Sequence, residues 1–300
     1  MSYRSIIISN SATLAVRNNN LVIKNENDYE IPIEDISVLV IEAISVNLTN
    51  RLLSKLSENG VATIVCNEKH LPISILLPLN THHRSYKVLK QQLEQSTPFT
   101  KRIWQNIIKQ KLFNQGKCLE ILNLNGVNFM KNLSENVESG DKGNREAIGA
   151  KFYFKCLFGE EFTRNDGNVI NSALNYGYTI IRSAVARTLV MYGFNTTLGV
   201  NHCNELNSFN LADDFMEPFR AIVDLWVYSN ITIDDDELYR ENRIQLVDLV
   251  NYQCVIDGQN HSILNAIDKM ISSYTTALSK KDFRLLKLPE IKPLEYHYYE

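Results

Sequence analysis

The stretch Pro98–Phe113, PFTKRIWQNIIKQKLF, indicates that the second part of this chain is helical. Its apolar side chains recur three and four residues apart, which places them on one face of an α-helix; they are Ile103, Trp104, Ile107, Ile108, Leu112 and Phe113. Pro98 suits the first turn of that helix, where a backbone N–H has no partner within the helix. The same spacing continues along the chain and predicts further helices at about 118–135, 144–158, 167–193, 211–229, 236–256 and 262–279.

The residues before this stretch have the pattern of a β-sheet domain. Short apolar, β-branched runs such as Tyr3–Ser9 and Val61–Cys66 alternate with turns, and one helix is expected from Asn47 to Asn59. A chain of 300 residues is long for a single core. The sequence therefore predicts an α+β fold: a small N-terminal β-sheet domain at 1–85, a larger all-α domain at 86–285 and an extended C-terminal tail at 286–300.

The composition is that of an ordinary globular protein, with 44% hydrophobic and 22% charged residues. No stretch approaches the roughly 20 apolar residues that span a bilayer, and the N-terminus lacks the pattern of a secretory signal. We therefore expect a cytoplasmic protein without a membrane partner. The five cysteines are widely spaced and form no C-x-x-C pair, which argues against a disulfide framework and against a thiolate zinc site.

The charges are unevenly distributed, although the net charge is only −3. Between Arg84 and Lys117 the chain has eight Lys or Arg residues and one acid, Glu94. Such a run is explained either as a solvated helix face or as a track for nucleic-acid phosphates. On the second interpretation the nucleic-acid-binding residues would be Arg84, Lys87, Lys101, Arg102, Lys109 and Lys111.

An acidic cluster lies in LADDFMEPFR, residues 211–220. On a helix, Asp213 and Asp214 share a face with Glu217, and three acids this close repel one another unless a cation compensates them. Asp213 and Asp214 are also explained as acids at a helix start, but Glu217 lies deeper and precedes Pro218. Pro218 either kinks this helix or begins a new one.

Two further residues complete a candidate metal site. His202 lies in the loop before the acidic cluster, and Glu146 lies in the first turn of an expected helix. Each has a simpler explanation, as a structural histidine and as an acid that compensates the helix dipole. Together with Glu217, however, an imidazole and two carboxylates suit Mg²⁺ or Mn²⁺.

The order of these motifs resembles the CRISPR-associated integrase family, Cas1, over almost the whole chain. The motifs are Arg145-Glu146-Ala147, Asn171-x-x-Leu-Asn-Tyr-Gly-Tyr178, Leu198-Gly-x-x-His202 and Leu211-Ala-Asp-Asp-Phe-Met-Glu-Pro-Phe-Arg220. The family has an N-terminal β domain and a larger α domain, and this chain looks most like members from type II systems. The resemblance implies that the β domain serves dimerisation and that the α domain is catalytic.

The resemblance also assigns roles to individual residues. It implies that Glu146, His202 and Glu217 are metal ligands, with Asp214 as an acid beside the metal that we count among the ligands. Some relatives have Asp in place of Glu217, which retains the carboxylate but changes its reach. Arg220, which suits a phosphate oxygen, and Tyr176, an aromatic lining the site, complete the expected catalytic set.

The activity that the resemblance implies is insertion of spacer DNA into a CRISPR array by a metal-dependent endonuclease and integrase. A 3′-hydroxyl would attack a phosphodiester, so that no protein nucleophile is required, with Mg²⁺ or Mn²⁺ as cofactor. The implied partners are double-stranded DNA (the spacer precursor and the repeat array), a second copy of the chain in a homodimer, the adaptation protein Cas2, and other CRISPR effector or accessory proteins.

Two other interpretations of the same residues remain open. The chain could be a metal-dependent phosphoesterase for a small substrate, which would need an enclosed pocket and no basic track. It could also be a non-catalytic DNA-binding scaffold, in which the acids cap helices and His202 is structural. Cleavage of branched DNA compared with a generic phosphoester separates the first alternative, and dependence of strand breakage on a divalent cation separates the second.

Overall fold

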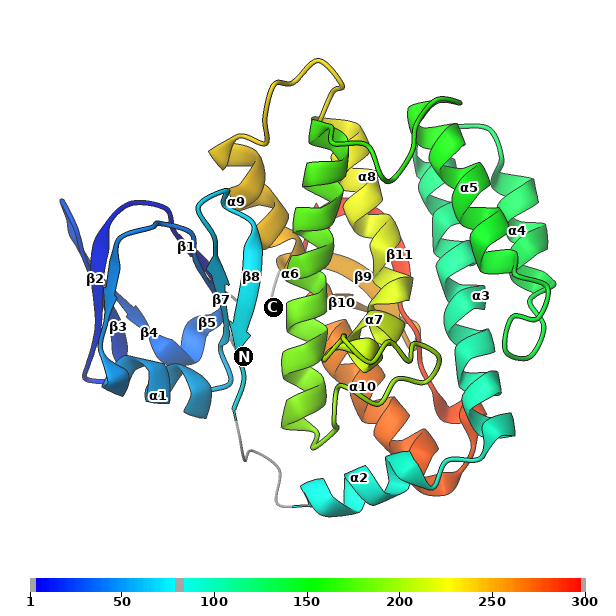
Figure 1. Ribbon diagram of the computed structural model, residues 1–300, viewed down its shortest axis with the longest axis horizontal. Helices are drawn as coiled ribbons and strands as arrows, with labels where there is room; N and C mark the ends of the chain where they lie inside the picture. The colour runs from blue at the N-terminus through cyan, green and yellow to red at the C-terminus, as the bar shows by residue number, and fades with distance from the viewer. Residues whose placement is uncertain (1–3, 79–83, 298–300) are drawn as a thin grey trace. The chain divides into compact units, whose positions relative to one another are not determined.

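The computed structural model describes residues 4–78 and 84–297, and the chain forms two compact units, residues 1–83 and 84–300 (Figure 1). The first unit contains two β-sheets and one helix, and the second is mainly helical. The expected order, a β domain followed by a helical domain, is therefore confirmed. Within the described residues, no helix combines the length and the apolar character that a membrane crossing requires.

The first unit is built from two four-stranded sheets. One has the strand order β1-β5-β7-β8 and the other the order β4-β3-β2-β6. In the first sheet β1, β5 and β7 run parallel, and β8 is antiparallel to β7. Their bounds are β1 Arg4–Ile8, β2 Ala12–Arg17, β3 Asn20–Lys24, β4 Asp28–Pro32, β5 Ile36–Ile41, β6 Val46–Leu48, β7 Ala62–Cys66 and β8 Pro72–Leu76.

Apolar side chains from both sheets meet in one core with helix α1, Asn50–Glu58. Leu14, Leu21 and Leu39 from the strands and Leu52 from α1 are fully buried there. Strand β5 is buried along its whole length, which explains why its sequence, ISVLVI, is apolar on both faces apart from Ser37, whose hydroxyl donates a hydrogen bond to the Arg4 carbonyl. Thr49 caps α1 by accepting a hydrogen bond from the Leu52 N–H.

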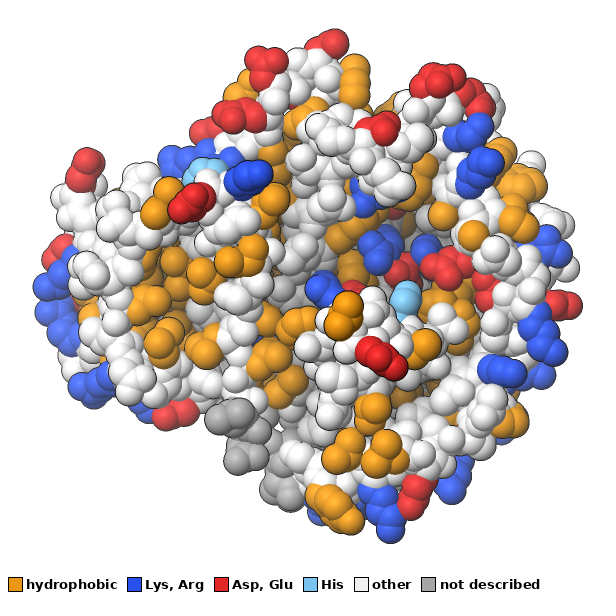
Figure 2. Space-filling view, in the orientation of Figure 1, with side chains coloured by type: hydrophobic (Ala, Val, Ile, Leu, Met, Phe, Trp, Pro, Cys, Tyr) orange, Lys and Arg blue, Asp and Glu red, His pale blue; other side chains and the backbone are white. Residues whose placement is uncertain are grey.

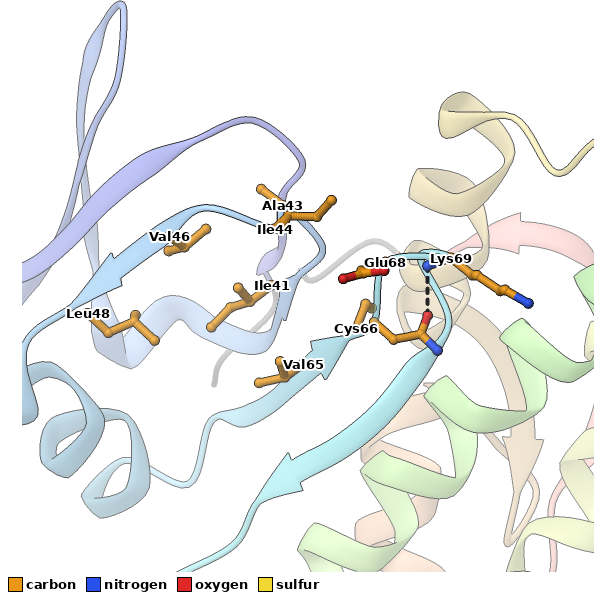
Figure 3. Close-up of a pocket in the computed structure, with 10 residues that line it drawn as sticks. Ile41, Ala43, Ile44, Val46, Leu48, Val65, Cys66, Glu68 and Lys69 are labelled. Atoms are coloured by element: carbon orange, nitrogen blue, oxygen red, sulfur yellow. Dashed lines mark hydrogen bonds between the residues drawn. The ribbon is translucent and has the colours of Figure 1, made fainter.

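An apolar pocket of about 530 Å³ opens in this unit (Figure 3). Ile41, Val46 and Val65 line it, and Ile44 at its margin is 77% exposed. The rest of the lining is also mostly aliphatic, and its polar side chains come from the single turn that contains Asn67, Glu68 and Lys69.

The second unit is organised around two long helices, α3 (Thr97–Ile121) and α6 (Val169–Met191), with α8 (Arg220–Asn230) packed against both (Figure 1). The apolar stripe predicted from the opening stretch is buried on α3, with the exception of Phe113. The remaining helices are α2 Ser85–Leu93, α4 Val127–Glu135, α5 Arg145–Phe158, α7 Asn210–Met216, α9 Arg240–Asp248 and α10 Ile263–Lys280, with short 3₁₀ turns between some of them.

The second unit is not all-α, because it contains a three-stranded antiparallel sheet. Its strands are β9 (Tyr252–Ile256), β10 (Gln259–Ser262) and β11 (Glu290–Tyr296), in the order β10-β9-β11. The expected helix at 236–256 is therefore wrong beyond Asp248, and the expected extended tail forms β11. The Asp257-Gly258 pair turns β9 into β10, and both residues have the positive φ that such a two-residue hairpin turn requires.

Candidate active site

The residues predicted from the acidic cluster lie where two helices meet at a bend. Helix α7 ends at Met216, a 3₁₀ turn covers Glu217–Phe219, and α8 begins at Arg220. Pro218 has no N–H to continue the first helix, and its carbonyl instead accepts a hydrogen bond of 2.7 Å from the Asn114 side chain on α3. The bend therefore fixes Glu217 against α3. A break in the helix at this point was expected, whether Pro218 kinks one helix or begins a new one.

Glu217 is a buried carboxylate held between two cations. Its Oε1 accepts a hydrogen bond of 2.9 Å from Arg220 Nε, and its Oε2 lies 2.6 Å from Lys111 Nζ. The second contact is an ion pair between two buried groups. Burial alone would raise the pKa of Glu217, but Arg220 and Lys111 outweigh it and lower that pKa to about 2. Glu217 is therefore ionised at neutral pH.

Lys111 links Glu217 to Glu146. Its Nζ donates a hydrogen bond of 2.7 Å to Glu146 Oε1, and its side chain is only 8% exposed. Burial alone would lower the pKa of Lys111, whereas Glu217 and Glu146 together raise it above its ordinary value. The ammonium group thus carries a full charge between the two carboxylates.

Glu146 turns toward this site because another acid caps its helix. Asp141 accepts hydrogen bonds from the backbone N–H groups of Arg145 and Glu146, at 2.9 and 3.0 Å. Two N–H groups in the first turn of α5 are therefore already satisfied by Asp141, and the Glu146 side chain contacts Lys111. Compensation of the helix dipole by itself does not account for that position.

His202 is oriented by Asp214. The His202 Nδ1–H donates to Asp214 Oδ1 at 2.7 Å, since a carboxylate can only accept. The opposite ring nitrogen, Nε2, is then the one left to bind another group. The hydrogen bond to Asp214 raises the pKa of His202, with the charge of Glu217 contributing. The His202 ring also packs edge-on against Trp104 of α3, at 5.6 Å between centroids.

Asp214, predicted among the metal ligands, is completely buried beneath this loop. Besides the His202 ring, it accepts hydrogen bonds from the backbone N–H groups of Val200, Asn201 and His202 at 2.5, 3.1 and 3.2 Å. Both of its oxygens are therefore used to hold the loop. Gly199 allows this approach, because a Cβ there would lie 2.2 Å from the His202 carbonyl oxygen and 2.8 Å from Asp214 Oδ2.

The aromatic residue beside Arg220 is Tyr178, which the sequence-based assignment missed. The Arg220 guanidinium lies 4.6 Å from the centre of the Tyr178 ring, and the Tyr178 hydroxyl donates a hydrogen bond to Asp224. Tyr176, the predicted residue, is two positions earlier on α6, so it points to nearly the opposite face of that helix. Gly177, between the two tyrosines, lies where α6 contacts α8, because a Cβ there would be 2.5 Å from Val223. A glycine inside a helix was therefore the sequence signal that this part of α6 packs closely against α8.

The predicted DNA-contacting cations separate into two groups. Arg84 and Lys87 on or beside α2, and Lys101 and Arg102 on α3, are exposed, and Lys109 is half-buried. Lys111 is instead part of the buried site, so its prediction as a surface phosphate contact is wrong. Lys111 follows Arg102 by nine residues, which is about two and a half turns of α-helix, so the two side chains point to opposite faces of α3.

The site as a whole joins charged side chains from α3, α5 and α7–α8 with a histidine from the intervening loop. Figure 2 shows acidic and basic side chains together with a histidine in a hollow on the surface of the helical unit. Across residues 4–78 and 84–297, no three His, Cys, Asp or Glu side chains converge closely enough to hold a metal ion as they stand. The donor types of Glu146, Glu217 and the outward ring nitrogen of His202 nevertheless fit Mg²⁺ or Mn²⁺.

Comparison with known proteins gives one consistent result. Residues 6–242 match the family described as "CRISPR associated protein Cas1". The chain is 43% identical to the CRISPR-associated endonuclease Cas1 of Neisseria meningitidis serogroup C over 312 aligned positions, which cover 100% of both chains. It is 23% identical to a CRISPR-associated endonuclease Cas1 of Francisella tularensis subsp. novicida, over 77% of this chain and 78% of that protein.

Solved structures share the fold. A casposase bound to its integration product superposes with a TM-score of 0.76, at 19% identity and 93% coverage of both chains. A Cas1 protein from Thermotoga maritima gives a TM-score of 0.72, at 18% identity, with 92% of this chain and 97% of that one covered. The family match, which covers most of the chain, and the full-length relative show that the chain belongs to the Cas1 family.

Proposed function

We propose that this chain is a divalent-metal-dependent DNA endonuclease and integrase that inserts spacer DNA into a CRISPR array. The observation that carries the proposal is the meeting of Glu146 and Glu217 on one cation, Lys111, beside a histidine whose free ring nitrogen faces away from its carboxylate partner. The family's named endonucleases and the casposase with its integration product support the same chemistry.

In this proposal Glu146, Glu217 and His202 Nε2 hold Mg²⁺ or Mn²⁺. When bound there, such a cation would supply Lewis-acid chemistry, lowering the pKa of the attacking 3′-hydroxyl and neutralising charge on the phosphate. Glu217 stays ionised over the working pH range because its pKa is about 2. Asp214 keeps the His202 ring in one tautomer and one orientation, so we assign it a positioning role rather than direct ligation.

Arg220 is placed to bind a phosphate oxygen. Its Nε is used by Glu217 and its plane packs on Tyr178, which leaves the guanidinium partly exposed and held in one orientation. A fixed planar cation contacts a phosphate with less loss of side-chain entropy than a mobile one does. The Arg220 guanidinium would therefore already be oriented to donate hydrogen bonds to the transferred phosphate.

The proposed partners follow from the surfaces of the two units. The exposed cations Lys101 and Arg102 on α3 suit duplex phosphates, and solved relatives include a Cas1–DNA complex and Cas1–Cas2 complexes. We propose that this chain likewise binds DNA and Cas2, and that the β unit forms a homodimer contact. Ile44 and Ile73, which are 77% and 64% exposed, provide apolar area for that contact.

Strand transfer by single-residue variants tests the proposal. Glu146→Ala, His202→Ala and Glu217→Ala should each abolish Mn²⁺-dependent joining of a short duplex with free 3′ ends to a repeat-containing plasmid, in the presence of Cas2. Glu135→Ala removes an exposed acid from α4 and should retain activity. Full activity in Glu217→Ala would rule out the assigned site. DNA binding without any metal-dependent strand breakage by the unmodified protein would favour the scaffold interpretation.

A further inference from the structure

Lys111 stands where a metal ion bonded to both carboxylates would stand. Its Nζ is 2.7 Å from Glu146 Oε1 and 2.6 Å from Glu217 Oε2. These contacts are only about half an ångström longer than the roughly 2.1 Å of a bond between Mg²⁺ and oxygen. One nitrogen and one metal ion cannot occupy the same position between the same two oxygens.

The charges of the four side chains that meet here already balance. Glu146 and Glu217 carry two negative charges, and Lys111 and Arg220 carry two positive charges. Adding a divalent cation to these four charges would leave an excess positive charge beside Glu217 and Lys111, which are both buried. Withdrawal of the Lys111 ammonium removes both the steric conflict and part of that excess.

The two cations differ in how firmly they are held. Arg220 is held by its Nε bond to Glu217 and by the Tyr178 ring beneath it, so two contacts fix its position. Lys111 ends a flexible side chain, and within the described residues its ammonium pairs with the two carboxylates alone. Displacement of this ammonium therefore breaks only its contacts with the two carboxylates that the metal would bind.

We propose that Lys111 is the resident counter-ion of the metal site, which a divalent cation must displace to bind. This inference rests on the proposed function, since it concerns the same three ligands. Lys111 stabilises the protein when no metal is bound, because without a cation the buried Glu217 carboxylate and the partly exposed Glu146 carboxylate beside it repel each other. It also weakens metal affinity, because the entering cation competes with a bound ammonium group.

Calorimetric titration with MnCl₂ of the full-length protein, pretreated with EDTA, tests the inference. Lys111→Met removes the competing cation and should bind Mn²⁺ at least tenfold more tightly than the unmodified protein. Lys111→Arg keeps the charge and should bind no more tightly than the unmodified protein. Lys109→Met removes one charge from the same helix outside the site and should leave the affinity unchanged.

Thermal unfolding provides the second measurement. Lys111→Met should have a lower Tm in EDTA than the unmodified protein, and Mn²⁺ should raise its Tm by more. If Lys111→Met does not fold, Lys111→Gln offers a neutral polar side chain to the carboxylates and carries the same two expectations. Unchanged or weaker Mn²⁺ binding in the neutral variants would overturn the inference and leave Lys111 with a structural role only.

Ligand variants separate this inference from the function on which it rests. If His202→Ala and Glu217→Ala weaken Mn²⁺ binding while Lys111→Met does not strengthen it, the role of Lys111 is wrong and the metal site stands. If His202→Ala and Glu217→Ala bind Mn²⁺ as tightly as the unmodified protein, the metal site itself is wrong, and the inference about Lys111 falls with it.

Discussion

Gly199→Ala should inactivate the protein although it adds a single methyl group outside the ligand set. The new Cβ would lie 2.2 Å from the His202 carbonyl oxygen, 2.8 Å from Asp214 Oδ2 and 3.2 Å from Asn210 Cβ. The first contact is with backbone, so the loop that carries His202 has to move by about an ångström. A displacement of that size in a catalytic group costs about 100-fold in rate.

The same displacement has calculable effects on metal affinity and stability. Disturbance of the group that orients a histidine ligand lowers metal affinity by roughly 10- to 100-fold. Loss of one of the three backbone hydrogen bonds to the Asp214 carboxylate costs about 1.5–3 kcal/mol. Strand transfer, Mn²⁺ titration and thermal unfolding measure these three effects.

Gly167→Ala is the matched control, because a Cβ at that position meets nothing within 4 Å. It should retain the activity, metal affinity and Tm of the unmodified protein to within small differences. If Gly199→Ala kept unmodified Mn²⁺ affinity and strand transfer, the rigid loop between Gly199 and His202 would not be what positions the imidazole, and the reasoning would fail.

Three further variants test Asp224, Arg220 and the exposed cations of α3. Burial raises the pKa of Asp224 to about 6. The protonated carboxyl therefore contributes its full stability below about pH 4, and this contribution is lost as the pH rises through 6. The loss lowers the free energy of unfolding by about 3 kcal/mol. The Tm of Asp224→Asn minus that of the unmodified protein should therefore increase between pH 4 and 6 and stay constant above pH 6. A Tm difference that does not change with pH would contradict this. Arg220→Lys keeps the charge but loses the planar contact with Tyr178, so strand transfer should fall about tenfold or more with little change in Tm, whereas unaltered rates would show that a point charge suffices. Charge reversal of Lys101 and Arg102 should weaken DNA binding and reduce its dependence on salt concentration. DNA titrations at several salt concentrations between about 50 and 200 mM measure both effects. Unchanged binding at every salt concentration would show that α3 does not contact DNA.

Helix α3 was predictable from the sequence because its core face repeats every three to four residues within one segment. The three-stranded sheet of the second unit was not, because β11 pairs with β9 from more than thirty residues away and short strands give weak periodicity. Asp257-Gly258 was the local signal for the β9–β10 hairpin. Long-range pairing explains why the C-terminal segment was expected to be an unpaired tail.

Lys111 shows what the basic run concealed. It lies four residues after Ile107 and three after Ile108, and therefore on the buried stripe of α3. A lysine at such a position requires a buried partner, and the partners, Glu146 and Glu217, come from elements that only the folded chain brings together. The helical position of Lys111 was readable in the sequence, but the identity of its partners was not.

Anomalous diffraction from crystals of the protein grown with Mn²⁺ tests the central claim most directly, because it locates the metal itself. We expect one strong manganese peak bonded to Glu146, Glu217 and Nε2 of His202, with the Lys111 ammonium moved away from the position between the two carboxylates. A manganese peak bonded to other residues, or a loaded protein in which Lys111 still joins Glu146 to Glu217, would contradict the assigned centre.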